Sequence, residues 1–241
     1  MPFLGHSRAP ADEMELGKQL RVALARGQIA LGALALRAGL DVGMVEGPQV
    51  ALDGAPRPEF GAILEQAREG VIDYRLDAPK HEFLSYLVHM RGQLLHGTAS
   101  PELDEVRPMP ATDYEVRTLE AVFATSDGIW PLFFATLDRA RAGSLWNGCY
   151  HLRRGSVLHR YYFFFTEADP HDDTIWRDGV VYVLPREPFA RTWIPNEWVS
   201  AEPVRAQARL AVSPSDFPFK TRVKQYDPRL SLMGNLRRFS R

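Results

Sequence analysis

The residues best suited to chemistry begin with a histidine at the end of a short apolar run, Leu94-Leu95-His96-Gly97-Thr98. The run predicts a strand, so a rigid element would hold His96, while Gly97, which has no Cβ, would leave the next backbone unit open to a ligand. A planar carboxamide can hydrogen bond to the N–H and C=O of such a glycine, and the imidazole can bind a hydroxyl group. Taken alone, a histidine in this position is more often structural.

The second candidate element is an aromatic strand that leads into a helix. Residues Ala121 to Thr125 predict the strand, and a polar turn then precedes a helix that begins at Ile129. Phe123 on the strand and Phe134 on the helix would offer two flat surfaces. A heterocycle such as nicotinamide can stack on rings of this kind, which contributes roughly 0.5–1.5 kcal/mol per pair. Buried phenylalanines more commonly fill a core.

The third element is a late acidic residue, Glu197, at the start of a predicted strand that follows Pro195. A glutamate beside the anomeric carbon of a ribose can accept a hydrogen bond from the 2′-hydroxyl group and stabilise an oxocarbenium-like cation. Glu197 could equally be an ordinary exposed strand residue or a partner of Arg191.

Together these three segments resemble the ADP-ribosyltransferase-like superfamily. Members with a His-Tyr-Glu triad have a strand ending in His-Gly-Ser/Thr, an aromatic strand-to-helix unit and a late glutamate, in this order. The resemblance covers about Gln93 to Val212, half of the chain, and points to a bacterial branch. It implies an α+β fold in which a split β-sheet domain of the ADP-ribosyltransferase type follows a small helical region.

The resemblance also implies roles for individual residues. His96 would contact a ribose hydroxyl group of NAD, with Thr98 beside it in the same binding motif. Gly97 would contact the nicotinamide amide, and Glu197 would act at the nicotinamide ribose as the essential carboxylate. NAD would thus be a substrate, and no metal site is predicted.

The aromatic positions depart from the family's pattern. Phe123 takes the place of the triad tyrosine, and Phe134, eleven residues on, that of a second stacking tyrosine. A small hydroxyl residue of the family falls at or near Pro131. Pro195 stands where members that modify arginine have Glu or Gln. The stacking surfaces are kept, the hydroxyl groups are lost, and the acceptor is not indicated.

The leading interpretation is an enzyme that cleaves the nicotinamide–ribose bond of NAD and transfers ADP-ribose to a protein, a nucleic acid or a small molecule. Transfer to water would make it an NAD glycohydrolase. A second interpretation, favoured by Phe123 and Pro131, is an inactive module that binds NAD, ADP-ribose or a protein in the same cleft. A relative of the RNA 2′-phosphotransferases is a third. A toxin or phage-defence role rests on analogy alone.

The composition indicates a folded protein with no general preference for a charged partner. The chain has 241 residues, 45% of them hydrophobic, which suffices for a substantial core. A net charge of -1 gives no global attraction to nucleic acid or anionic lipid. The single cysteine, Cys149, allows no intrachain disulfide. No apolar stretch approaches the roughly 18 residues of a membrane span, so we expect a cytoplasmic protein.

Familiar catalytic motifs are absent from the sequence. It contains no dinucleotide-binding Gly-x-Gly-x-x-Gly, phosphate-binding P-loop, hydrolase Gly-x-Ser-x-Gly or zinc-protease His-Glu-x-x-His. A phosphate groove is conceivable around Gly155, although a charged hairpin exposed to water is the favoured interpretation. The residues concerned are His151, Arg153, Arg154, His159 and Arg160.

The elements that must position these residues fall into three regions. Helical spacing predicts helices near residues 14–27, 29–38, 60–67 and 79–91, so residues 1–91 read as a helical region for regulation or docking. Residues 92–225 would form the ADP-ribosyltransferase-like domain, in which short β-branched and aromatic runs predict strands. Its one convincing helix spans Ile129 to Ala142. Residues 226–241 read as a basic, solvated tail.

Overall fold

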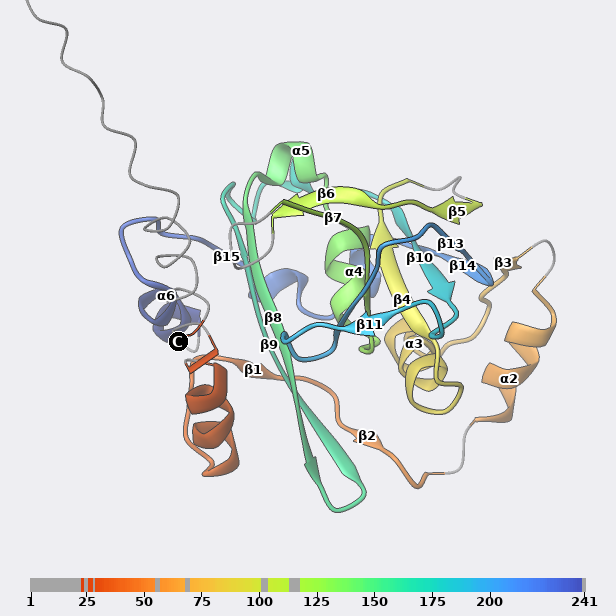
Figure 1. The fold of residues 1–241 in the computed structure, drawn as a ribbon, viewed down its shortest axis with the longest axis horizontal. Coiled ribbons are helices and arrows are strands. Elements are labelled where there is room, and N and C mark those ends of the chain that lie inside the picture. The colour runs from red at the N-terminus through yellow and green to blue at the C-terminus, as the bar shows by residue number, and fades with distance from the viewer. Residues whose placement is uncertain are drawn as a thin grey trace, which may run out of the picture.

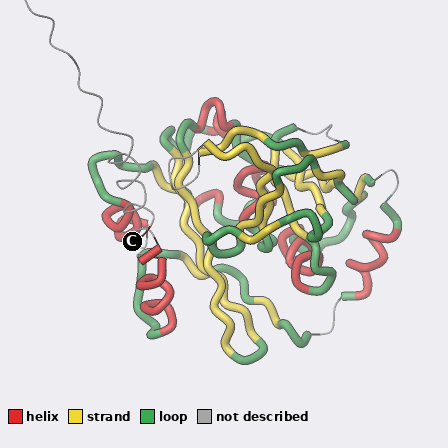
Figure 2. The backbone as a smooth tube through the Cα atoms, in the orientation of Figure 1, coloured by secondary structure: helices red, strands yellow, loops and turns green. Residues whose placement is uncertain are grey.

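A computed structural model describes residues 23, 26, 27, 29–54, 57–67, 70–100, 104–112 and 118–239. Two main sheets with helices around them form the arrangement of Figures 1 and 2. The predicted α+β class is therefore confirmed. Within the described ranges, no helix is both long and apolar enough to cross a membrane.

The larger sheet contains all three segments singled out in the sequence. Its strand order is β11-β12-β7-β4-β10-β14-β3, and β6 pairs with β7 beside this path. The strands are β3 Val71–Ile72, β4 Leu94–Thr98, β6 Met109–Thr112, β7 Thr118–Thr125, β10 Gly179–Leu184, β11 Ala190–Arg191, β12 Glu197–Ser200 and β14 Ala208–Val212. Only β7 therefore separates the strand of His96 from the strand of Glu197.

A long hairpin forms the centre of the second sheet. Strands β8 (Leu145–Arg154) and β9 (Val157–Thr166) pair along their whole length and turn at Gly155, which has a φ of 61°. Three short strands line β9, namely β1 Val45–Glu46, β2 Val50–Ala51 and β15 Lys224–Gln225. Figure 1 shows the hairpin extending well past the larger sheet. A further small sheet pairs β5 Glu105–Val106 with β13 Val204–Arg205.

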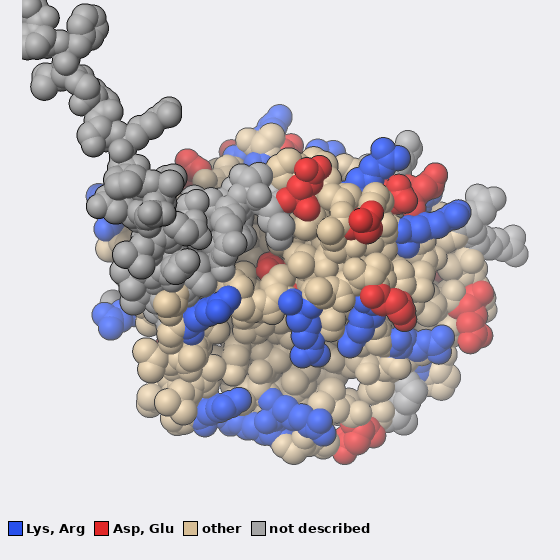
Figure 3. All heavy atoms as spheres, in the orientation of Figure 1, with Lys and Arg blue, Asp and Glu red and all other residues tan. Residues whose placement is uncertain are grey.

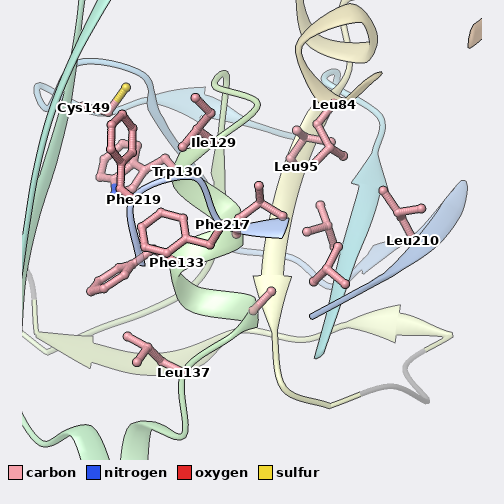
Figure 4. Close-up of a cluster of buried hydrophobic side chains, with 14 of the residues drawn as sticks. Leu84, Leu95, Ile129, Trp130, Phe133, Leu137, Cys149, Leu210, Phe217 and Phe219 are labelled. Carbon is pink, nitrogen blue, oxygen red and sulfur yellow. The ribbon is translucent and has the colours of Figure 1, made fainter. Parts of the chain in front are cut away.

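Two helices close the main core against the larger sheet. They are α3 (Lys80–His89) and α4 (Trp130–Ala135). Figure 4 shows the apolar side chains that they share with β4 and the C-terminal segment, among them Leu84, Leu95, Phe133 and Phe217. The remaining helical elements are residues 29–37, α2 Pro58–Glu65, α5 Arg139–Ala142, α6 Leu232–Phe239 and 3-10 turns at Asp173–Ile175, Pro214–Asp216 and Lys220–Arg222.

Two glycines allow the backbone of α4 to lie directly on the sheet. A Cβ atom at Gly97 would be 1.9 Å from the carbonyl oxygen of Pro131, and one at Gly179 would be 1.9 Å from that of Ala135. The helix thus rests on β4 and β10 where neither strand has a side chain. This corrects the expectation that Gly97 is sterically open, because the first turn of α4 fills the space in the direction of its missing Cβ.

Gly97→Ala is expected to lower the free energy of unfolding by about 3 kcal/mol, the upper end of the usual cost of overpacking. The clashing atom is a backbone oxygen, which cannot rotate away as a side chain can. Urea unfolding measures the change. The control is Gly32→Ala, because a Cβ atom added at Gly32 would have no neighbouring atom within 4 Å. Alanine is also a better helix former than glycine, so the free energy of unfolding should rise by up to about 1 kcal/mol. A loss below about 0.5 kcal/mol at Gly97 would mean that α4 moves away freely.

The helix predicted from Ile129 to Ala142 is in fact two helices. After α4, Leu137 forms an isolated β-bridge with Trp176, and Asp138 then caps α5 by accepting a hydrogen bond from the N–H of Ala140. Leu137 and Ala142 are both fully buried. The apolar spacing therefore continues across the break, which is why spacing alone predicted a single helix.

Two further expectations need correction. Residues 1–91 are not only helical, because β1, β2 and β3 lie among them and pair with strands of both main sheets. Two-residue strands are too short to show the alternation that predicts a strand. The predicted solvated tail contains α6, where Leu236 packs against Phe163 and Phe165. The predicted helix 14–27 lies outside the described residues except at 23, 26 and 27, which are helical.

Candidate functional site

His96 lies where β4 and β7 separate. These strands pair at Leu95 and Thr125 alone, and one residue further Nδ1 of His96 is 2.7 Å from the carbonyl oxygen of Phe123. A carbonyl oxygen only accepts hydrogen bonds, so Nδ1 carries the proton and Nε2 keeps its lone pair. Burial is the main reason why the pKa of His96 is lowered. The neutral ring therefore offers Nε2 as an acceptor at neutral pH.

The backbone of Gly97 is directed into the same gap. The N–H of Ser126 donates to the carbonyl oxygen of Asn196 on the β12 side. Backbone polar groups alternate in direction along a strand, so those of Thr125 point toward β4 and meet Leu95. Gly97, two residues after Leu95, directs its N–H and C=O to the same side, where pairing with β7 has ended. A donor and an acceptor side by side match a carboxamide.

The two predicted stacking rings lie on adjoining elements. Val122 and Ala124 belong to the core on one face of the sheet, so Phe123 between them points to the other face, which α4 covers. Phe134 is half-buried on α4, and its ring centroid is 5.6 Å from that of Phe133. The guanidinium group of Arg139 lies 6.0 Å from the ring of Phe134.

Glu197 begins β12 on the other side of β7. Glu197 on β12 and Leu95 on β4 both pair with Thr125 on β7. Two strand spacings of about 4.8 Å each therefore separate β12 from β4. Oε1 of Glu197 accepts a hydrogen bond of 3.0 Å from the hydroxyl group of Thr192. The preceding residue, Asn196, has a φ of 64° and donates through Nδ2 to the carbonyl oxygen of Cys149. These contacts fix where β12 starts.

The predicted residues are thus brought into one region to different degrees. The ring of His96, the backbone of Gly97 and the carbonyl group of Phe123 border the gap between β4 and β7. Alternation places the side chains of Phe123 and Glu197 on the sheet face that α4 covers, whereas His96, between Leu95 and Gly97, lies on the opposite face. Glu197 lies about 10 Å from β4 across the sheet. Thr98 ends β4, where its Oγ1 accepts from the N–H of Ser100 at 3.2 Å. Phe134 lies on the neighbouring helix. The roles given to all of them stay predictions.

A buried group of polar side chains, here named the Asp127 cluster, was not predicted from the sequence. Oδ1 of Asp127 accepts from the backbone N–H groups of Ile129 and Trp130 at the start of α4, at 2.7 and 2.6 Å. Oδ2 accepts from Nε2 of His151 at 2.8 Å and from the hydroxyl group of Tyr162 at 2.7 Å. The cluster consists of Asp127, Ser85, Cys149, His151, Arg160 and Tyr162.

Charge within the cluster is concentrated on two residues. Burial by itself would raise the pKa of Asp127, but the hydrogen bond from His151 and the charge of Arg160 hold this pKa far below its ordinary value. Nη1 of Arg160 lies 3.8 Å from Oδ2 of Asp127 and 2.8 Å from Oγ of Ser85. Burial raises the pKa of Cys149 and of Tyr162. The thiol is therefore protonated and is no ready nucleophile.

Strand alternation is the signal that could have revealed the cluster. Cys149 is paired with Tyr162, and His151 with Arg160, so all four side chains share one face of the hairpin. The expectation of an exposed charged hairpin is wrong for Arg160, which is 1% exposed. The expectation of an exposed charged hairpin holds at the tip of the hairpin, where Arg153 is exposed.

Figure 3 shows Lys and Arg side chains over the lower part of one face, with acidic groups between and above them.

Three histidines, His81 buried and His89 and His96 partly buried, predict that acid destabilises the fold. Burial lowers the pKa of His81, His89 and His96 from 6.5, and that of His89 to about 4. Between pH 6.5 and about 4 the unfolded chain binds more protons than the folded chain. Stability is therefore full above pH 6.5 and falls with pH by up to about 1.4 kcal/mol per unit for each group. Urea unfolding from pH 7 to pH 5 tests this. His81→Gln should make the dependence shallower, and an unchanged slope would contradict it.

Known proteins offer no guide to this site. Among models of protein families, curated proteins and solved structures, none matches the chain. Function must therefore be inferred from the residues and their geometry.

Proposed function

We propose that the protein binds NAD at the gap between β4 and β7, cleaves its nicotinamide–ribose bond and passes ADP-ribose to an acceptor. The observation that carries this proposal is the direction of the Gly97 N–H and C=O into the gap, beside an imidazole whose Nε2 is an acceptor. A primary carboxamide supplies the complementary acceptor and donor, and a ribose hydroxyl group supplies the donor for Nε2.

The proposed reaction uses Gly97, an aromatic ring and Glu197 in turn. Nicotinamide binds through its amide to Gly97 and stacks against Phe123 or Phe134. The bond from C1′ of the ribose to the ring nitrogen breaks, and its electron pair leaves with nicotinamide, which becomes neutral. The carboxylate of Glu197 stabilises the oxocarbenium-like cation that remains. The acceptor then attacks C1′ and loses a proton.

The order of the sheet supports the proximity of these residues, with Phe123 and Glu197 on the face that α4 covers and His96 on the other face. Glu197 follows His96 by 101 positions, yet their strands are both neighbours of β7. The strands β4 and β7 share a single residue pair, so the sheet is open beside Gly97. This opening agrees with the split sheet that the resemblance implies, and we include the ADP-ribosyltransferase type of fold in the proposal.

A binding module without activity is the second candidate. Phe123 supplies no hydroxyl group to a bound ribose, and the carbonyl of Pro131 lies against Gly97 where the family has a small hydroxyl residue close by. Stacking and amide recognition survive both changes, whereas transition-state contacts are fewer.

Incubation of the purified protein with NAD separates these candidates. We expect release of nicotinamide, followed by chromatography, and calorimetric binding of NAD. Free ADP-ribose as the second product would identify a glycohydrolase, and ADP-ribose attached to an added protein, nucleic acid or small molecule would identify a transferase. Binding without release would favour the inactive module. The absence of both NAD binding and nicotinamide release at millimolar NAD would contradict the proposal.

A further inference from the structure

Three side chains of the Asp127 cluster are of the types that bind metal ions. A carboxylate oxygen of Asp127, Sγ of Cys149 and a ring nitrogen of His151 all lie within 4.8 Å of one another. Around a tetrahedral zinc ion, bonds of about 2.0–2.3 Å place ligand atoms roughly 3.3–3.8 Å apart. Small movements of side chains would therefore bring these atoms to ligand distance. Figure 4 shows Cys149 beside the start of α4, where Ile129 and Trp130 follow Asp127.

A second observation comes from His89 at the end of α3. Its Nε2 is buried and has no hydrogen-bond partner, and its ring centroid is 6.0 Å from that of His151. Buried polar atoms without partners are rare in folded proteins. An imidazole nitrogen without a hydrogen-bond partner can provide its lone pair to a metal ion.

We propose that Asp127, Cys149, His151 and His89 form a closed site for one zinc ion. One thiolate, two imidazoles and one carboxylate suit zinc, whereas magnesium and calcium prefer oxygen ligands alone. Binding releases the thiol proton of Cys149 to solvent, and the Nε2 proton of His151 moves to Nδ1 of the same ring, so that the imidazole stays neutral while Nε2 binds the ion. The two positive charges of the ion are then balanced by the thiolate and the carboxylate.

Groups around these four residues would hold the ligands in place. The hydroxyl group of Tyr162 donates to Oδ2 of Asp127, and two backbone N–H groups donate to Oδ1. Nδ2 of Asn196 lies 3.7 Å from Sγ of Cys149, where it can donate to a thiolate. Outer contacts of this kind orient ligands and tune metal affinity. Four protein ligands leave no open coordination position, which indicates a structural role for the ion, not a catalytic one.

Cobalt(II) provides a decisive probe, because the chain has only one cysteine. Metal-free full-length protein, prepared with a chelator, is titrated with Co²⁺ and followed by absorption spectroscopy. We expect one equivalent to produce tetrahedral visible bands and a near-ultraviolet thiolate-to-cobalt charge-transfer band. Zinc should abolish both bands and raise the melting temperature. Since only Cys149 can give the charge-transfer band, the wild-type result decides even if a variant fails to fold.

Matched variants identify the ligands. Cys149→Ser should remove the charge-transfer band, and His89→Gln should weaken cobalt binding at least about tenfold. His159→Gln is the control, because His159 is on the same hairpin but pairs with Glu46 at the surface, and it should change neither property. The proposal is overturned if wild type gives no charge-transfer band at one equivalent, or if His89→Gln binds cobalt as tightly as wild type. The NAD assay and the cobalt titration are separate measurements, so that either proposal can fail without the other.

Discussion

Asp127→Asn is expected to lower the free energy of unfolding of the metal-free protein by roughly 3–5 kcal/mol, the range seen when one partner of a buried ion pair is removed. The asparagine keeps the size of the side chain but has one acceptor oxygen, while four hydrogen bonds converge on the two oxygens of Asp127. Arg160, which is 1% exposed, would also lose its nearest counter-charge. Urea unfolding in the presence of a chelator measures the change.

Asp138→Asn is the matched control for this substitution. Asp138 also binds the first turn of a helix, but its ion pairs with Arg141 and Arg177 involve partners that are 61% and 51% exposed. Asparagine caps helices about as well as aspartate, so the expected loss is below about 0.5 kcal/mol. A loss at Asp127 no greater than that at Asp138 would show that the buried charge is dispensable.

Glu197→Gln is expected to slow nicotinamide release by about 10²- to 10³-fold, the usual effect of removing one electrostatic contact to a transition state. Glutamine has the same shape and can still accept the hydrogen bond from Thr192, but it carries no charge to oppose a developing cation. Binding of NAD should change much less than the rate. Single-turnover release of nicotinamide and calorimetric titration measure the two quantities separately.

Glu202→Gln serves as the comparison for Glu197→Gln. Glu202 is exposed and lies two residues beyond the end of β12, so the variant should release nicotinamide at the wild-type rate. Equal rates for wild type and Glu197→Gln would remove Glu197 from the proposed reaction. Loss of NAD binding in Glu197→Gln would instead give this residue a binding role.

The elements that the sequence predicted well are those with a strong local pattern. Apolar spacing indicated α2, α3 and the strands that carry His96, Phe123 and Glu197, and the structure places each of these strands within a few residues of its expected position. The neighbourhood of β4, β7 and β12 could not be read from local patterns, because strand pairing depends on contacts between distant parts of the chain. The adjacency of these three strands was suggested by the resemblance to a family and not by local spacing.

The Asp127 cluster was missed because charged residues are normally exposed. Arg160 and His151 lie in a segment rich in charge near a glycine turn, which is typical of an exposed hairpin. Their burial follows from tertiary packing against α3, where Ser85 receives the guanidinium group. Alternation puts Cys149 and His151 on one face of β8 and Arg160 and Tyr162 on one face of β9, but only pairing of the two strands shows that these are the same face.

The two glycines under α4 connect the two regions of the molecule that the proposals concern. The helix starts beside Asp127 and carries Phe134 toward its end, while the oxygens of Pro131 and Ala135 rest on Gly97 and Gly179. Because backbone oxygens of this one short helix contact both strands so closely, we expect the two ends of α4 to move together. On the two proposals above, we expect a ligand that fixes one end of α4 to favour the binding of a ligand at the other end. By thermodynamic reciprocity, zinc would raise the affinity for NAD by the same factor by which NAD raises the affinity for zinc.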